Sequence, residues 1–424
     1  MSITKKKTLS ITSQIVLASA LALILGSLIG EPMKNIQFIG TIWLRLIQMS
    51  IIALIMTSVA GAIGSIGGSG AGKLSFHTFK YIISFTFISA FIGLGLALLI
   101  QPGVGINITT GLETTESTLG SVSIIDTIVN FVPTNIFAAM SQGATVQAIV
   151  FSLLFGLAAG KYAQITGRDN ILSFLKDVNG VVLQIIEMVM KFAPIGIFAL
   201  LGGVAATTGF DVIMPMIKFL MALLIADLIM FALYIPYTAV RVGVNPLKMP
   251  KKFAKMSIMA LTITSSAICL PTKMEDSVTK FGVSRKVADF TGPITMTMNS
   301  SGAVACYVLA ILFMAQSTGT VLTTVEMMTG VLLAAMMTMG TIVVPGGSVV
   351  VYTFFATTLG LPMESIAILI GIDWFAGMLR TIMNVDIDVL IAMLVSKDLN
   401  EFNYDVYNEK VVVEYKNAVE VGTV

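Results

Sequence analysis

Long hydrophobic runs separated by short polar stretches predict a chain that crosses a membrane several times. A transmembrane helix needs about 20 mostly apolar residues, and a helix satisfies its own backbone groups where water is absent. The runs show no strand-like alternation, so we predict an all-α protein. The predicted spans are 11–29, 39–62, 79–100, 127–162, 181–206, 212–240, 287–315 and 365–396, and 127–162 is too long for one straight helix.

Two further apolar segments, 249–276 and 325–361, are interrupted in the middle. The first contains Thr264-Ser265-Ser266 ahead of Pro271, and the second breaks at Val344-Pro345-Gly346-Gly347-Ser348. Such tips expose hydroxyl and N–H groups at the end of a half-helix, where a carboxylate can bind. Either motif alone is more often a simple turn, but its position inside an apolar segment is specific.

Positive charges indicate the direction of threading, because Lys and Arg near short loops stay in the cytoplasm. Lys5–Lys7 place the N-terminus inside, whereas the connection 102–125 has Glu but no Lys or Arg, which fits the outside. Eight crossings agree with the remaining charges only if each interrupted segment enters and leaves on one side. We therefore predict eight transmembrane helices plus two re-entrant helical hairpins of opposite entry, with both termini cytoplasmic. This pattern is typical of an inverted-repeat secondary transporter.

Ionisable residues lie inside the last predicted helix, where each costs at least about 2.5–3.5 kcal/mol at bilayer depth. Arg380, Asn384 and Asp388 follow one another at intervals of four and share a helical face, and Asp373 lies on nearly the same face. The guanidinium would bind an anionic substrate through a fork of donors, with oxygens of Asn384 and Asp388 serving a substrate or a small cation. The alternative is an ion pair that only holds helices together. We favour function, because exposed helix ends lie beside these residues.

Composition narrows the class of protein. The chain is 56% hydrophobic and 11% charged, with a mean hydropathy of +0.93, whereas a soluble domain has about 25% charged residues. A net charge of +2 leaves no basic surplus for nucleic acid. Cys269, Cys306 and the single His77 provide no disulfide framework, metal cluster or Ser/His pair, so we expect neither an enzyme nor a cofactor. We expect an integral protein of the plasma membrane that retains its first span.

Several short segments together resemble one family over nearly the whole chain. Residues 265–271 are similar to a serine-rich first hairpin, 299–303 to an Asn-Met-Asp-Gly-Thr signature, and 344–347 to a second-hairpin tip. The stretch 373–388 is the closest match. The chain thus resembles the dicarboxylate/amino acid:cation symporter family, which has the glutamate transporter fold. Residues 133–137 and 191–196 also resemble segments of its fourth and fifth helices.

This resemblance implies a homotrimer in which a transport domain moves as an elevator against a scaffold. The implied boundaries are scaffold helices 1–2 at 1–76, helix 3 of the transport domain at 77–102, scaffold helices 4–5 at 126–208, the rest of the transport domain with both hairpins at 209–397, and a solvated cytoplasmic tail at 398–424.

The resemblance also implies a substrate site with two departures from the family. Members that select acidic amino acids carry an Asp three residues before the conserved Arg, where it holds the ammonium group; here that residue is Gly377. Retention of Arg380 fits a dicarboxylate without an amino group. Ala303 replaces a Thr that assists the side-chain carboxylate, so a neutral or larger amino acid remains open. The implied substrate-binding residues are Arg380, Thr381, Asn384, Ser265, Ser266, Gly346, Gly377 and Ala303.

Cation sites follow from the same resemblance. One family sodium site corresponds to Phe85, Ile88, Ser89, Asn299 and Ser301, which lack three of its oxygens and its only charge, so we predict that it is empty. A second site at Asn384 and Asp388, with nearby carbonyls, looks intact. A third consists mostly of carbonyl groups. The implied cation ligands are Asp388, Asn384, Asn299, Thr295, Thr297, Thr338 and Thr341.

We therefore expect a secondary active symporter that couples inward Na+ or H+ flow to uptake of a small anionic solute, a dicarboxylate or an acidic amino acid. Asp227 lies in the middle of a span and is a possible proton acceptor, because burial favours the neutral form of a carboxyl group; a structural role is the alternative. An ion channel, the other class considered, needs a continuous pore. The expected partners are a small-molecule substrate, the lipid bilayer and two further copies of the chain.

Overall fold

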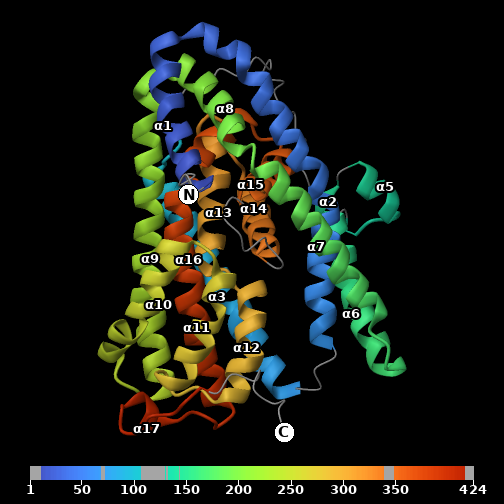
Figure 1. Cartoon of the computed structure of the whole chain (residues 1–424), viewed down its shortest axis with the longest axis vertical. Coiled ribbons are helices and arrows are strands. Elements are labelled where there is room, and N and C mark those ends of the chain that lie inside the picture. Colours follow the sequence, from blue (N-terminus) through green and yellow to red (C-terminus); the bar gives the residue numbers. More distant parts are fainter. Residues whose placement is uncertain are drawn as a thin grey trace, which may run out of the picture.

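The computed structural model describes residues 11–67, 72–106, 129, 132–142, 144–338 and 348–415, and all its regular elements are helices (Figure 1). Six helical segments of this described part are long and apolar enough to cross a membrane. The number of spans and the entry sides of the two interrupted segments stay predictions. The six segments are Glu31–Gly61, Gly72–Ile100, Gln147–Thr166, Ala193–Val242, Arg285–Gln316 and Glu364–Asp398.

The first group of helices packs through small residues. Helix α2 (Gln37–Gly67) lies against α6 (Thr145–Thr166), where a Cβ at Gly160 would be 2.5 Å from the backbone oxygen of Gly64. At the interface of α1 (Ile11–Ile29) and α8 (Ala193–Thr208), a Cβ at Gly26 would lie 2.5 Å from the oxygen of Gly202. Glycine lets two backbones approach closely where lipid supplies no hydrophobic driving force.

Two predicted spans of this group are divided. The span predicted at 181–206 is wrong as one helix, because α7 (Asn170–Met190) ends before a turn at Lys191 and Phe192, and Pro194 occupies the first turn of α8. The long run 127–162 is also broken, as its length required. It contains the short α5 (Ile136–Ser141) and most of α6, while residues 127, 128, 130, 131 and 143 lie outside the described part.

A second group of helices surrounds α13 (Ser301–Gln316), in which every residue from Ser301 to Ala315 is buried. A helix that is apolar on all sides belongs in the centre of a bundle, and Figure 1 shows α13 in the interior of the molecule. Its neighbours include α3 (Gly72–Ile100), α9 (Ile213–Val242) and α16 (Glu364–Asp398). A Cβ at Gly93 of α3 would lie 2.6 Å from the oxygen of Ala305 of α13, so this contact requires glycine.

The first interrupted segment forms the predicted pair of half-helices. Helix α10 (Met249–Ile263) ends at Thr264, whose φ of 53° is left-handed, and α11 (Ser266–Thr279) begins two residues later. The two helices contact each other, and both contact α16. In the second segment α14 (Thr324–Met337) and α15 (Ser348–Leu359) lie on either side of residues 339–347, which are outside the described part and include Gly346 and Thr341.

The span predicted at 287–315 lies within the candidate span Arg285–Gln316, which is broken in the middle. Helix α12 (Arg285–Met298) ends at Asn299, which is extended with φ −117° and ψ 106°, and α13 starts at Ser301. The side chain of Asn299 donates to Asp388 of α16 at 2.8 Å, so a tertiary contact holds the break. Helix α16 is uninterrupted. The charged face predicted for 365–396 therefore lies on one continuous helix, which packs against the broken helices.

The segment after α16 is docked through a few buried side chains, while most of residues 399–415 are exposed. Phe402 and Tyr407 are buried, and α17 (Tyr404–Tyr407) lies at one end of the molecule in Figure 1. The Tyr407 hydroxyl donates to the backbone oxygen of Asn245 at 2.7 Å, and the Asn403 N–H donates to that of Gly282 at 2.7 Å. These bonds tie the tail to the α9–α10 and α11–α12 connections.

Charged contacts support the same docking. Glu401 accepts from the Ser284 hydroxyl at 2.7 Å and from the Lys286 ammonium at 2.9 Å, and these bonds lower the pKa of Glu401. The Lys252 ammonium lies 3.0 Å from Glu409 and lowers the pKa of that carboxyl. Burial raises the pKa of Tyr407 to about 12.

Candidate functional site

The polar face of α16 meets a different broken segment at each level. Asp373 reaches α15, Asn384 reaches the start of α13, and Asp388 reaches α11 and α12. Arg380 stands between them. The predicted arrangement of these side chains on one face is therefore what brings the ends of the broken helices together.

Arg380 is paired with a carboxylate. Its Nη2 lies 3.0 Å from Asp373 Oδ1, and its Nη1 donates to the Tyr352 hydroxyl at 3.2 Å. Asp373 also accepts from Tyr352 at 3.3 Å and from the Ser348 hydroxyl at 3.0 Å. Both charged side chains are about 10% exposed. The ion pair that the sequence offered as the alternative to function is therefore present, although it does not use all the donors of the guanidinium.

Unused capacity remains on the Arg380 side. A guanidinium carries five N–H groups, and contacts with the described residues occupy two of them. Gly377 lies beside it, and a Cβ there would be 3.4 Å from Arg380 Nη2, so a side chain would narrow the approach. The start of α13 also meets Arg380, because a Cβ at Gly302 would be 2.6 Å from the Arg380 backbone oxygen. Among the described residues, the other donors of Arg380 have no hydrogen-bond partner.

Other predicted substrate residues lie around this cluster or apart from it. The Thr381 hydroxyl donates to the Gly377 oxygen at 2.7 Å, and Ala303 is buried one residue beyond Gly302. Ser265 and Ser266 are buried at the α10–α11 tip, whereas the described partners of Arg380 come from α15 and α16.

A second ion pair lies two turns further along α16. Lys273 of α11 places its ammonium 2.6 Å from Asp388 Oδ2, 2.9 Å from the Gly292 backbone oxygen and 3.3 Å from Thr295 Oγ1. The other oxygen of Asp388 accepts from Asn299. The side chains of Lys273 and Asp388 are only 3% and 1% exposed.

Two of the predicted cation ligands, Asp388 and Thr295, thus place oxygens against the ammonium of Lys273. An ammonium has three N–H donors, and three oxygens face it. A metal ion beside the same carboxylate would repel the ammonium by about 4 kcal/mol at 4 Å and an effective dielectric constant of 20. The set Asp388, Asn299 and Thr295 therefore does not fit a metal ion while Lys273 stays in place.

The remaining predicted cation ligands have other partners. Asn384 accepts from the N–H groups of Gly302 at 2.9 Å and Ala303 at 3.2 Å, which caps α13. The Thr297 hydroxyl donates to Pro293 at 3.1 Å and that of Thr338 to Ala335 at 2.7 Å, both within their own segments. Thr341 lies outside the described residues.

Aromatic rings occupy the place of the altered sodium site on α3. Phe85 stacks on Tyr234 of α9 with ring centroids 4.2 Å apart, and the Tyr234 hydroxyl lies 2.8 Å from Ser89 Oγ. Ser301 donates to Asn299 Oδ1 at 3.3 Å. These contacts supply a structural role for residues that the resemblance associated with a lost cation site.

Two buried carboxyl groups have an oxygen without a hydrogen-bond partner among the described residues. They are Asp227 on α9 and Asp386 on α16, and the second oxygen of Asp386 accepts from Ser257 at 2.6 Å. Neither belongs to the two ion pairs described above.

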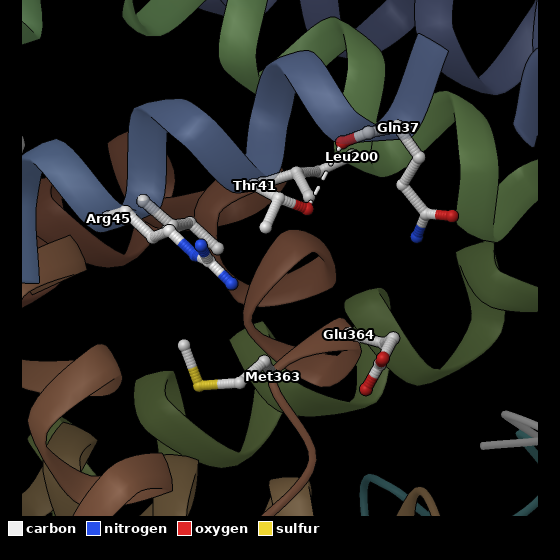
Figure 2. Close-up of a pocket in the computed structure, with 7 residues that line it drawn as sticks. Gln37, Thr41, Arg45, Leu200, Met363 and Glu364 are labelled. Atoms are coloured by element: carbon white, nitrogen blue, oxygen red, sulfur yellow. Dashed lines mark hydrogen bonds between the residues drawn. The ribbon is translucent and has the colours of Figure 1, made fainter. Parts of the chain in front are cut away.

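A pocket of about 280 Å³ lies elsewhere, between α2, α8 and the start of α16. Figure 2 shows Arg45 of α2 and Glu364 of α16 reaching into it from different helices. Its lining shares no residue with the Arg380 cluster. Its lining residues are Gln37, Thr41, Leu44, Arg45, Leu200, Met363 and Glu364.

Sequence reasoning missed Lys273 and Tyr352, and it named Ser348 only as part of the second tip. Lys273 had a usable signal, since a lysine inside an apolar interrupted segment needs a partner at membrane depth. Tyr352 had none, because a hydroxyl in an apolar helix is usually satisfied by its own backbone.

An all-helical chain with several membrane-spanning helices, whose charged groups lie where broken helices meet, belongs to the class of secondary transporters. Residues 11–398 match the sodium:dicarboxylate symporter family. The chain is 31% identical to a proton/sodium-glutamate symport protein of Bacillus subtilis (strain 168), over 94% of this chain and 95% of the relative. The chain belongs to the sodium:dicarboxylate symporter family and is a cation-coupled symporter.

More distant relatives carry other substrate names. A proton/glutamate-aspartate symporter of Escherichia coli (strain K12) is 27% identical over 93% of this chain and 94% of the relative. A C4-dicarboxylate transport protein of Rhizobium leguminosarum bv. trifolii (strain WSM2304) is 25% identical over 92% of this chain and 89% of the relative.

Proposed function

We propose that this protein takes up a small dicarboxylate by cation-coupled symport, with Arg380 holding a substrate carboxylate. One observation carries the proposal: a buried guanidinium retains donors without a partner among the described residues, where α13, α15 and α16 meet. A fork of charged donors in a low-dielectric place binds a carboxylate strongly and with a fixed orientation. Thr381, Asn384, Ala303 and the α10–α11 tip with Ser265 and Ser266 would complete the pocket, together with Gly346.

Gly377 supports a dicarboxylate over an amino acid. The position beside the guanidinium has no side chain to accept an ammonium group, and it leaves space next to Arg380 Nη2. Among the relatives, C4-dicarboxylate transport proteins match over nearly the whole chain, which agrees with this substrate class.

An acidic amino acid is the second candidate, and Asp373 favours it. This carboxylate lies 3.0 Å from Arg380, so the pair offers one charge of each sign to a zwitterion. The relatives with higher identity are named as glutamate symporters, which agrees with that choice.

For the movement, we propose the elevator of a homotrimer. Helices α1, α2 and α6–α8 would form the scaffold, whereas α3 and α9–α16 would form the moving domain, and these two groups match the contacts between helices. The pocket between α2 and the start of α16 lies at their boundary (Figure 2).

The coupling ion is a sodium ion or a proton, as in the names of the bacterial relatives. Carbonyl groups near Thr297, Thr338 and Thr341 remain the proposed place for a sodium ion, because oxygen ligands suit a hard cation.

Uptake into proteoliposomes tests the assignment of Arg380. Arg380→Ala should reduce concentrative uptake of labelled C4-dicarboxylate at least about 100-fold, since losing a charged fork of hydrogen bonds costs about 3 kcal/mol or more. Arg285→Ala is the matched control, because this arginine is on the same group of helices but is partly exposed and pairs with Asp289 at the surface. Wild-type uptake by Arg380→Ala would contradict the proposal. Uptake of glutamate, aspartate and neutral amino acids is measured in parallel to distinguish the candidate substrates, with sodium and pH gradients imposed separately. A flux that only dissipates a gradient would indicate a channel.

A further inference from the structure

We propose that the ammonium of Lys273 is a built-in cation that occupies the place of a coupling metal ion at Asp388. The inference rests on the proposed function, since it concerns which ion drives the symporter. The observation behind it is a lysine that is buried against Asp388, at one end of the polar face of α16.

The surroundings of this ammonium are those of a cation site. Its three partners are a carboxylate of α16 and a backbone carbonyl and a hydroxyl of α12. The Thr295 hydroxyl gives its own proton to the Thr291 oxygen at 2.8 Å, which leaves its lone pair for Lys273. Every N–H of the ammonium thus has an oxygen, as a hard cation would require of its ligands.

Charge balance closes the site. One carboxylate faces one ammonium, and the second oxygen of Asp388 is taken by the Asn299 amide. The Asn299 amide donates to Asp388 through its nitrogen, and its oxygen accepts from the Ser301 hydroxyl at 3.3 Å. A metal ion would therefore add a positive charge without a matching negative one, so it would have to expel the ammonium.

The lysine is held firmly at this level. A Cβ at Gly292 would be 2.7 Å from the Met274 side chain, so α11 and α12 are in close contact beside Lys273. The Ser277 hydroxyl donates to the Lys273 backbone oxygen at 2.7 Å. Because the side chain is 3% exposed, it has no open path to water by which to withdraw.

The consequence is a specificity for the coupling ion. Sodium acts at another site or is not needed, and neither the stability of the protein nor its substrate affinity depends on sodium at Asp388.

Removing the Lys273 side chain beyond Cβ would leave a cage made of the Gly292, Thr295 and Asp388 oxygens with one negative charge. That cage should take up the sodium ion that the lysine replaces.

Sodium binding by the purified full-length protein tests this without any transport assay. Thermal midpoints and labelled sodium binding are measured in sodium chloride and in choline chloride at equal ionic strength. For Lys273→Ala, sodium should raise the midpoint by about 5 °C and bind in a saturable way, whereas the wild type should show no sodium effect that depends on Asp388. Lys280→Ala is the matched control, because this lysine also pairs with an aspartate but is 35% exposed; it should behave like the wild type.

Two results would overturn the proposal. One is a folded Lys273→Ala protein that shows no response to sodium. The other is sodium binding by the wild type that disappears in the neutral double variant Lys273→Gln/Asp388→Asn. If Lys273→Ala does not fold in either salt, this comparison of wild type and double variant decides: unchanged sodium behaviour supports the proposal, and lost binding refutes it. Because binding is measured directly, failure of every solute in the uptake panel would refute the proposed function and leave this result standing.

Discussion

The two ion pairs on α16 have the same charges but differ in how completely they are satisfied. Lys273 has three donors and three oxygens, and it is almost wholly buried with Asp388. Arg380 has five donors, and within the described part of the chain it contacts Asp373 and Tyr352 through two of them, beside Gly377. The first pair is closed and the second is able to accept a ligand.

This difference separates structure from binding within one helix. A buried pair contributes little net stability, because desolvation offsets the attraction, but removal of one partner is costly. The loss of stability is smaller where the remaining charge has another partner. Arg380 has an alternative partner in an incoming anion, whereas Lys273 has none in the described structure.

The largest expected effect is the loss of Asp388. Asp388→Asn leaves the Lys273 ammonium without a counter-charge, and we expect a loss of about 3–5 kcal/mol in stability. Asp373→Asn should cost less, about 1.5–3 kcal/mol, because Arg380 keeps Tyr352. Thermal midpoints in one detergent measure both, with the exposed Asp289→Asn as a control near zero. Equal losses at the two positions would remove the distinction between the pairs.

The next prediction concerns the affinity of the open pair. Asp373→Asn frees Arg380 from a competing carboxylate, so a C4-dicarboxylate should bind about tenfold more tightly, equivalent to about 1.4 kcal/mol. An amino acid should instead bind more weakly, since its ammonium would lose the same carboxylate. Direct binding of labelled solutes to the purified variant measures the change, and weaker binding of the dicarboxylate would favour the second candidate substrate.

The smallest effect should come from Asn384, which lies one turn from each pair. Asn384→Ala removes two accepted hydrogen bonds at the start of α13 and should cost about 1 kcal/mol in stability. A role in capping alone predicts an unchanged dissociation constant for the solute. A large loss of affinity at nearly normal stability would instead show that Asn384 contacts the substrate.

Much of the helical framework could be predicted from hydrophobic runs. The half-helices around Thr264 and the continuous α16 follow from local sequence. The polar residues at 264–266 stop the first helix, whereas the polar residues of α16 leave that helix continuous. The break at Asn299 could not be predicted, because an Asn is tolerated inside a helix unless a distant partner holds it, and here that partner is Asp388, 89 residues away.

Part of the site could be predicted from the sequence, because part of its geometry is local. The spacing of Arg380, Asn384 and Asp388 placed them on one face, because helical geometry is local. The identity of their partners depends on which helices lie opposite. Lys273 is 115 residues before Asp388 in the sequence, and Tyr352 is 28 residues before Arg380. Only tertiary packing turned a predicted cation ligand into the counter-charge of a lysine.

The docked segment after α16 has a practical consequence for anyone who expresses this protein. Tyr407 and Asn403 join the base of α9 to the turn before α12, so they act as a clasp across two connections. A reporter that replaces the residues after Asp398 would remove these contacts, whereas one attached beyond Tyr415 would preserve them. A low yield of the shorter fusion would therefore reflect the loss of these contacts.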